Sequence, residues 1–112
     1  MIVESSMRVN NQNSQDTSKD LLRIVNDVLD TEYAGRYRST IARNGSILIS
    51  LKLSPVKYEI RIFNEKYTLI YYDYTGNSSV IYYSKDISII LDKLLDSIED
   101  EFSYIDSVNR MV

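Results

Sequence analysis

The residue types that could do chemistry in this chain are carboxylates, lysines, tyrosines and serines, because histidine and cysteine are both absent. Without these two types the chain cannot use a Ser-His-Asp or Cys-His mechanism, form a disulfide or build the usual zinc site. The densest group of acids, Asp92, Asp96, Glu99 and Asp100, lacks the glycine-containing spacing of a calcium loop. We interpret it as the solvated side of a helix. The sequence therefore predicts no catalytic, metal or cofactor residues, and a protein that is not an enzyme.

The composition indicates a small intracellular globular protein. A length of 112 residues, with 44% hydrophobic and 26% charged residues, is ordinary for one domain with one core. No apolar run approaches the roughly 18 residues that a membrane span needs, and the first residues lack the pattern of a secretory signal. We expect a cytoplasmic protein with no membrane contact.

The elements that must position any functional side chain begin with a run of β-strands. Five segments are rich in Ile, Leu and Tyr, alternate in polarity and are separated by turn residues. We expect strands at residues 36–42, 46–54, 57–63, 67–74 and 79–84. Asn44-Gly45 favours a tight hairpin turn between the first two.

The faces of the fourth and fifth strands depend on the lengths of the loops before them. With two-residue loops at Asn64-Glu65 and Gly76-Asn77, one set of side chains shares the face of Ile60: Tyr67, Leu69, Tyr71, Val80 and Tyr82. The other set lies opposite: Ile70, Tyr72, Tyr74, Ile81 and Tyr83. A three-residue loop at Asn64 would exchange the two sets, because side chains alternate with a period of two.

Helical periodicity flanks the strands on both sides. The first helix is expected to begin at Thr17 and end at Gly35, and the second to open near Ser84 or Asp86 and run to about Ile105. Residues 1–15 are polar and predict a flexible tail, which leaves 16–112 as a single domain. The predicted fold class is α+β: an antiparallel meander sheet of four to five strands, with both helices packed on one face.

Charge is distributed unevenly along the chain. Residues 35–85 hold eight basic and three acidic residues, whereas residues 1–34 hold three and six and residues 86–112 hold two and seven. The sheet is therefore basic and the helices are acidic. Combined with the alternation, this predicts a partner-binding surface on the sheet face away from the helices, made of Arg36, Arg38, Lys52, Arg61, Phe63, Tyr72, Tyr74 and Tyr83. If one helix instead covered each face, no such surface would exist.

Tyrosine and arginine are enriched at the energetic centres of protein interfaces. The first hypothesis is therefore a protein-binding domain of the adaptor, inhibitor, immunity or anti-defence kind, which binds a protein partner or a second copy of itself as a homodimer. The second is nucleic-acid binding on the same sheet face, because aromatic rings stack on bases while basic groups hold phosphates. A carboxylate-dependent enzyme is the third.

Overall fold

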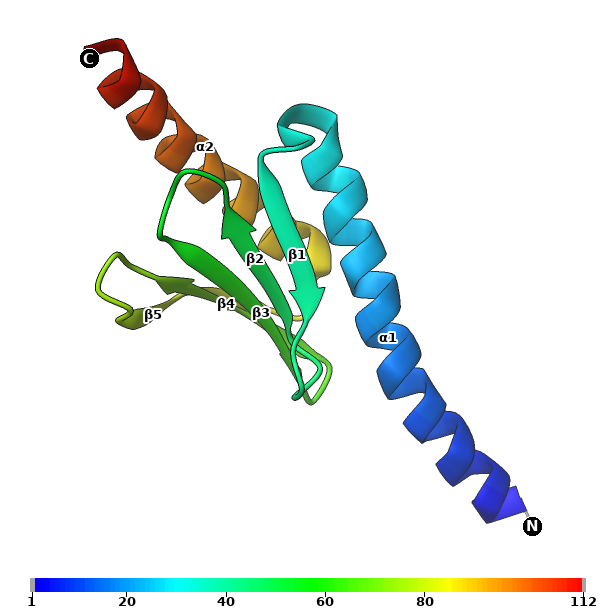
Figure 1. Ribbon diagram of the computed structural model, residues 1–112. Helices are drawn as coiled ribbons and strands as arrows, with labels where there is room; N and C mark the ends of the chain where they lie inside the picture. Colours follow the sequence, from blue (N-terminus) through cyan, green and yellow to red (C-terminus); the bar gives the residue numbers. More distant parts are fainter. Residues whose placement is uncertain (1, 112) are drawn as a thin grey trace.

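A computed structural model describes the backbone of residues 2–111 and the side chains of residues 17–110. The chain forms seven elements in this order: α1 (Ile2–Tyr33), β1 (Tyr37–Ile41), β2 (Ile47–Leu51), β3 (Lys57–Phe63), β4 (Lys66–Tyr72), β5 (Ser78–Ser84) and α2 (Ile87–Met111). The strands make one sheet in which each strand pairs antiparallel with its neighbour in the chain (Figure 1). The predicted α+β meander is confirmed.

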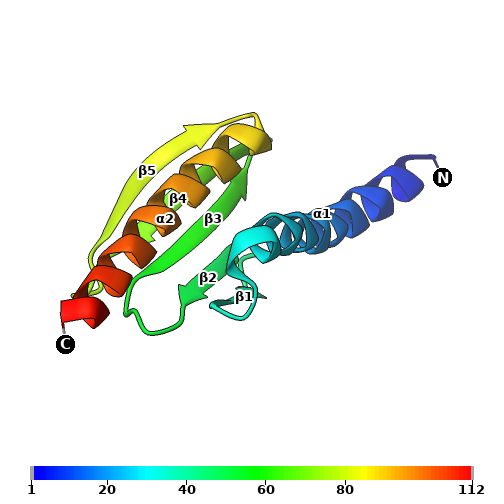
Figure 2. The same ribbon diagram turned by 90° about the horizontal axis from the view of Figure 1, so that it is seen from above.

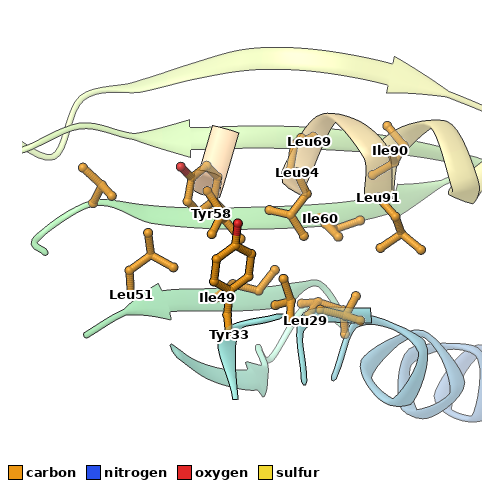
Figure 3. Packing of buried hydrophobic residues seen from close by; sticks show 14 of the residues in the cluster. Leu29, Tyr33, Ile49, Leu51, Tyr58, Ile60, Leu69, Ile90, Leu91 and Leu94 are labelled. Atoms are coloured by element: carbon orange, nitrogen blue, oxygen red, sulfur yellow. The ribbon is translucent and has the colours of Figure 1, made fainter. Parts of the chain in front are cut away.

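Both helices lie on one face of the sheet, as the sequence predicted. Helix α1 covers β1 and β2, while α2 covers β4 and β5 (Figure 2). Side chains of both helices meet the inward side chains of the central strands: Leu29 and Tyr33 of α1 and Ile90, Leu91 and Leu94 of α2 surround Ile49, Tyr58, Ile60 and Leu69 (Figure 3). The single core therefore lies between the helix layer and one face of the sheet.

The end of α1 and the segment that follows it also contact α2. The rings of Tyr33 and Phe102 lie 5.1 Å apart, centroid to centroid. The Arg36 guanidinium lies 4.0 Å from the centroid of the Phe102 ring and donates a hydrogen bond of 3.2 Å to Asp106. This cluster closes the core at one end.

The first hairpin has a three-residue loop rather than a two-residue turn at Asn44-Gly45. The Gly45 amide donates to the Ala42 carbonyl at 2.9 Å and the Ala42 amide donates to the Ser46 carbonyl at 2.8 Å. Only Gly45 has a positive φ, of 85°, in this loop. That pattern is a type I turn followed by a left-handed glycine. The Ser18 hydroxyl of α1 donates to the Gly45 carbonyl at 2.9 Å and ties the loop to the helix.

The hairpin between β3 and β4 has the predicted two-residue loop at Asn64-Glu65. Asn64 and Glu65 both have positive φ, 50° and 61°, and Phe63 pairs with Lys66. Tyr67, Leu69 and Tyr71 consequently share the core face of the sheet with Ile60. This part of the two-residue prediction is confirmed.

The loop between β4 and β5 has three residues, 74–76, rather than the predicted two-residue turn at Gly76-Asn77, because the Asp73 amide donates to the Asn77 carbonyl at 2.9 Å. Together with a β-bulge in β5, this loop overturns the predicted faces of two residues. Leu69 pairs with Tyr82, whereas the next residue, Ile70, pairs with Val80, so that Ile81 has no partner in β4. Val80 therefore lies on the face away from the helices, although the regular alternation placed it on the core face. Ile81 lies on the helix side, beside Tyr58.

The helix boundaries differ most from the predicted ones at two of four ends. Helix α1 begins at Ile2 rather than Thr17, and α2 continues to Met111 rather than ending near Ile105. Asp86 accepts a hydrogen bond of 2.9 Å from the Ser88 amide, and it caps α2 one residue before its first residue, Ile87. Nothing tests the predicted flexibility of residues 1–15, whose side chains lie outside the described part of the chain, and it stays a prediction.

Candidate functional site

The face of the sheet away from the helices, hereafter the open face, is defined by the strand register. Glu59 of β3 and its neighbours in line across the sheet belong to it, because their side chains alternate with those of Tyr58 and Ile60 in the core. Its members are Arg38, Thr40, Ser46, Leu48, Ser50, Lys57, Glu59, Arg61, Phe63, Lys66, Thr68, Ile70, Tyr72, Ser78, Val80 and Tyr83.

A buried carboxylate forms the centre of the open face. Glu59 is 4% exposed, and one of its oxygens, Oε2, accepts hydrogen bonds from the Ser46 hydroxyl at 2.7 Å and from Arg61 Nε at 3.0 Å. The other oxygen, Oε1, accepts one from the Tyr72 hydroxyl at 2.5 Å. Glu59 of β3 thereby links Ser46, the residue before β2, to Tyr72 of β4. Ser46, Glu59, Arg61 and Tyr72 are hereafter called the Glu59 network.

The electrostatics of the Glu59 network favour the ionised carboxylate. Burial by itself raises the pKa of Glu59, but the hydrogen bonds from Arg61, Tyr72 and Ser46 outweigh it and lower the pKa to about 2. The same contact acts in the opposite direction on the phenol, because the hydrogen bond to the Glu59 carboxylate raises the pKa of Tyr72. The negative charge of Glu59 is therefore matched by Arg61 within the face.

Around this centre the open face is apolar and basic. Phe63 is 77% exposed, Tyr83 68% and Val80 60%. The remaining charged members, Arg38, Lys57 and Lys66, are all basic and exposed. Since Glu59 is paired with Arg61, these residues give the face a net positive charge.

The structure brings together five of the eight predicted site residues on the open face: Arg38, Arg61, Phe63, Tyr72 and Tyr83. Lys52 is exposed just beyond the end of β2, at the margin of the face, where its amide donates to the Arg36 carbonyl at 3.0 Å. Their predicted role in binding stays a prediction.

Two of the predicted residues lie on the helix side instead. Arg36 precedes β1, and its guanidinium contacts Phe102 and Asp106 of α2. Tyr74 follows β4, and its hydroxyl donates a hydrogen bond of 3.0 Å to Glu101 of α2. Both lie outside the strands, so the alternation on which their assignment rested does not extend to them.

Sequence reasoning missed the polar members that organise the centre and the apolar one at its edge. Ser46 and Glu59 were not predicted as site residues, because neither side chain is typical of the centre of a protein interface. A signal for Glu59 was present, since residues 59 and 61 share a face of one strand and carry opposite charges. Val80 had no such signal, because the three-residue loop before β5 and the bulge together place it there.

The helix side carries a shallow groove of about 320 Å³ between the loop after β2 and the end of α2. Leu53, Pro55, Tyr104 and Val108 line it. Glu101 at its border accepts hydrogen bonds of 3.0 Å from the Ser54 and Tyr74 hydroxyls. Glu101 is the one carboxylate among the described residues that line this groove, and together with Asp100 it also lines a neighbouring pocket beside Tyr58 and Ser97.

Comparison with protein-family models, with curated proteins and with solved structures finds no match to this chain. Among the described residues, no three acidic side chains gather as a metal site would require. Within the same part of the chain, neither helix has an apolar stretch long enough to cross a bilayer. The open face is therefore the candidate site.

Proposed function

We propose that this chain is a non-enzymatic protein-binding domain, of the adaptor, inhibitor, immunity or anti-defence kind, that binds an acidic surface of a partner protein with its open face. The observation that carries the proposal is the exposure of Phe63, Tyr83 and Val80 on a face whose unpaired charges are all basic. Exposed aromatic rings combined with basic groups are typical of the energetic centres of protein interfaces.

Charge favours a different protein over a second copy of the open face. Two open faces in contact would bring Arg38, Lys57 and Lys66 of one copy near the same residues of the other. Like charges brought together at an interface cost several kcal/mol. A partner with an acidic surface would instead gain from the same three residues, in both its rate of encounter and its specificity.

The Glu59 network supports binding because it fixes the surface before a partner arrives. Its hydroxyl, guanidinium and carboxylate groups satisfy one another across neighbouring strands. A partner would not have to order these side chains, which removes an entropy cost of about 0.5–1.5 kcal/mol for each side chain immobilised. Phe63 and Tyr83 then provide the area that is buried.

The test is affinity capture from cells of the source organism with the tagged full chain, compared quantitatively between variants. The double variant Phe63→Ala/Tyr83→Ala removes two exposed rings, and Tyr104→Ala, which removes an exposed ring on the helix side, is the matched control. We expect proteins captured by the wild type and by the control to be lost from the double variant. Equal capture by all three would contradict the proposal.

Nucleic acid is the second candidate, and one observation favours it. Phe63 and Tyr83 present exposed rings on a basic face that also carries Lys66, the combination that single-strand binders use for stacking and phosphate contacts. A mixed-sequence single-stranded oligonucleotide should then bind more weakly at 200 mM than at 50 mM salt. Binding that is absent at low salt would exclude this candidate.

A further inference from the structure

One stripe of the C-terminal half of α2 is lined by empty space rather than by the sheet. The groove of about 320 Å³ beside the loop between β2 and β3 and a pocket of about 360 Å³ beside β3 and β4 meet at Glu101. Figure 2 shows this half of α2 passing along that loop. The residues of α2 that line the two recur three or four positions apart and so share one side of the helix: Ser97, Asp100, Glu101, Tyr104 and Val108. The groove and the pocket along this stripe are hereafter called the α2 groove.

The opposite wall of the α2 groove contains a residue in a strained conformation. Leu53 has a φ of 66°, in the left-handed region that a bulky residue rarely adopts, and it is 84% exposed. This conformation costs stability without burying apolar surface. Backbone strain of this kind gathers at binding sites, where the surrounding structure maintains it. The exposed rings of Tyr74 and Tyr104 line the same groove, so the fold leaves an apolar surface uncovered here.

The charge of the α2 groove is negative and is not matched within the described part of the chain. Asp100 and Glu101 belong to none of the ion pairs that the described residues form. The hydrogen bonds that Glu101 accepts there come from neutral hydroxyls, those of Ser54 and Tyr74. Burial and the charge of Glu101 raise the pKa of Tyr71, and no cationic group acts against this shift. The groove is therefore complementary to a positively charged group.

We infer that the α2 groove binds an extended segment of a partner protein, in which an arginine or lysine lies a few residues from a large apolar side chain. The basic side chain lies against Asp100 and Glu101, and the exposed ring of Tyr104 beside them is suited to a cation. The apolar side chain lies between Leu53 and Val108. Seven positions of a helix, from 101 to 108, span about 10 Å. An extended chain covers that distance in about three residues.

This site is distinct from the open face and has the opposite charge preference. The open face offers basic groups to an acidic surface, whereas the α2 groove, on the helix side, offers Asp100 and Glu101 to a basic segment. Complementary charge gives such contacts their specificity. The two sites can therefore be tested separately.

The first test titrates the isotope-labelled full chain with two sets of peptides of about seven residues and follows the amide signals by NMR. In one set leucine and arginine are fixed three positions apart and the other positions vary, and in the other set glutamate replaces the arginine. We expect arginine peptides to bind with a Kd below about 1 mM, more weakly at high salt, and to shift the signals of Leu53 and Tyr104 but not those of Phe63 and Tyr83. Absence of binding, equal binding of the glutamate set, or shifts confined to the open face would overturn the inference.

The second test removes the negative charge and uses the tightest arginine peptide. In Asp100→Asn/Glu101→Gln the amide oxygen that replaces the Glu101 carboxylate can still accept the hydrogen bonds from Ser54 and Tyr74. We expect this double variant to bind the peptide at least tenfold more weakly than the wild type. Asp92→Asn, which changes an exposed carboxylate of α2 outside the groove, is the matched control and should bind as the wild type does. Equal affinity of all three proteins would contradict the inference.

The third test concerns the strained residue. Asparagine adopts the left-handed conformation more readily than leucine does. In Leu53→Asn we therefore expect an unchanged or higher midpoint of thermal unfolding, together with an affinity for the arginine peptide that is at least fivefold weaker. A lower midpoint with unchanged affinity would show that Leu53 serves the fold rather than binding, and the inference would be wrong.

Two further measurements separate this site from the open face and from self-association. Phe63→Ala/Tyr83→Ala should bind the arginine peptide as the wild type does and Tyr104→Ala should bind it more weakly, the reverse of what binding by the open face predicts. Failure of one site is thus distinguishable from failure of the other. If light scattering shows a dimer of the purified chain that Asp100→Asn/Glu101→Gln abolishes, the occupant is a second copy and the inferred partner segment is wrong.

Discussion

Replacing Glu59 by glutamine tests whether the ionised carboxylate at the centre of the open face stabilises the fold. Glutamine keeps the size and shape of the side chain but removes the charge that Arg61, Tyr72 and Ser46 surround. In the folded protein the pKa of Glu59 is lowered from 4.5 to about 2. Each pKa unit corresponds to about 1.4 kcal/mol, so ionisation of Glu59 contributes about 3 kcal/mol to the free energy of unfolding at pH 7.

The pH dependence of this contribution has a definite sign. Because the pKa is lower in the folded state, the stabilisation is complete above the unfolded pKa, and it is lost as the pH falls through the folded pKa. We expect the wild type to exceed Glu59→Gln by about 3 kcal/mol at pH 7, by about half of that at pH 3, and by little at pH 2.

Urea denaturation followed by far-ultraviolet circular dichroism at several pH values measures the difference directly. Asp92→Asn is the matched control, because Asp92 is an exposed carboxylate of α2 outside the Glu59 network. A difference between wild type and Glu59→Gln that is the same at pH 7 and pH 3 would refute the reasoning. So would a glutamine variant as stable as the wild type at pH 7.

Three further substitutions test the contacts that hold the helices to the sheet. Tyr37→Phe removes the hydroxyl that donates to Asp30, and we expect a loss of about 1 kcal/mol in the free energy of unfolding, measured by urea denaturation. Gly45→Ala places a Cβ at a φ of +85° and 3.3 Å from the Ser18 hydroxyl, so we expect a loss of about 1–2 kcal/mol by the same assay, whereas a neutral result would mean that this loop rearranges. Leu94→Ala empties a fully buried position between α2 and the sheet, and we expect it to cost about 2–5 kcal/mol and to lower the midpoint of thermal unfolding.

The regular parts of the fold could be predicted because they follow from local patterns. The alternation in residues 57–63 defined β3 with the bounds that the structure has, Lys57–Phe63, and the same alternation indicated which side of the sheet is apolar. The helices followed from their apolar stripes, of which Leu21, Val25 and Leu29 are buried against the sheet. The placement of both helices on one face was also predicted, together with the uneven distribution of charge between the helices and the sheet.

The errors occurred where tertiary contacts, rather than local pattern, decide the geometry. Asn44-Gly45 is compatible with two kinds of hairpin loop, and the loop that forms is the one whose carbonyl meets Ser18 of α1. Nothing in the local sequence marks the bulge at Ile81, which together with the three-residue loop 74–76 places Val80 on the open face. Arg36 and Tyr74 adjoin strands without belonging to them, and contacts with α2 determine where they lie.

The order of strands in the sheet has a consequence for how the chain folds during synthesis. Every strand pairs with its neighbour in sequence, so the whole sheet can form from local hairpins before helix α2, which is 25 residues long, leaves the ribosome. Until α2 arrives, Ile60 and Leu69 lack the cover that α2 gives them, and the nascent sheet presents an apolar surface. Completion of the native state thus waits for the contact between Arg36 and Asp106, which are 70 positions apart in the chain.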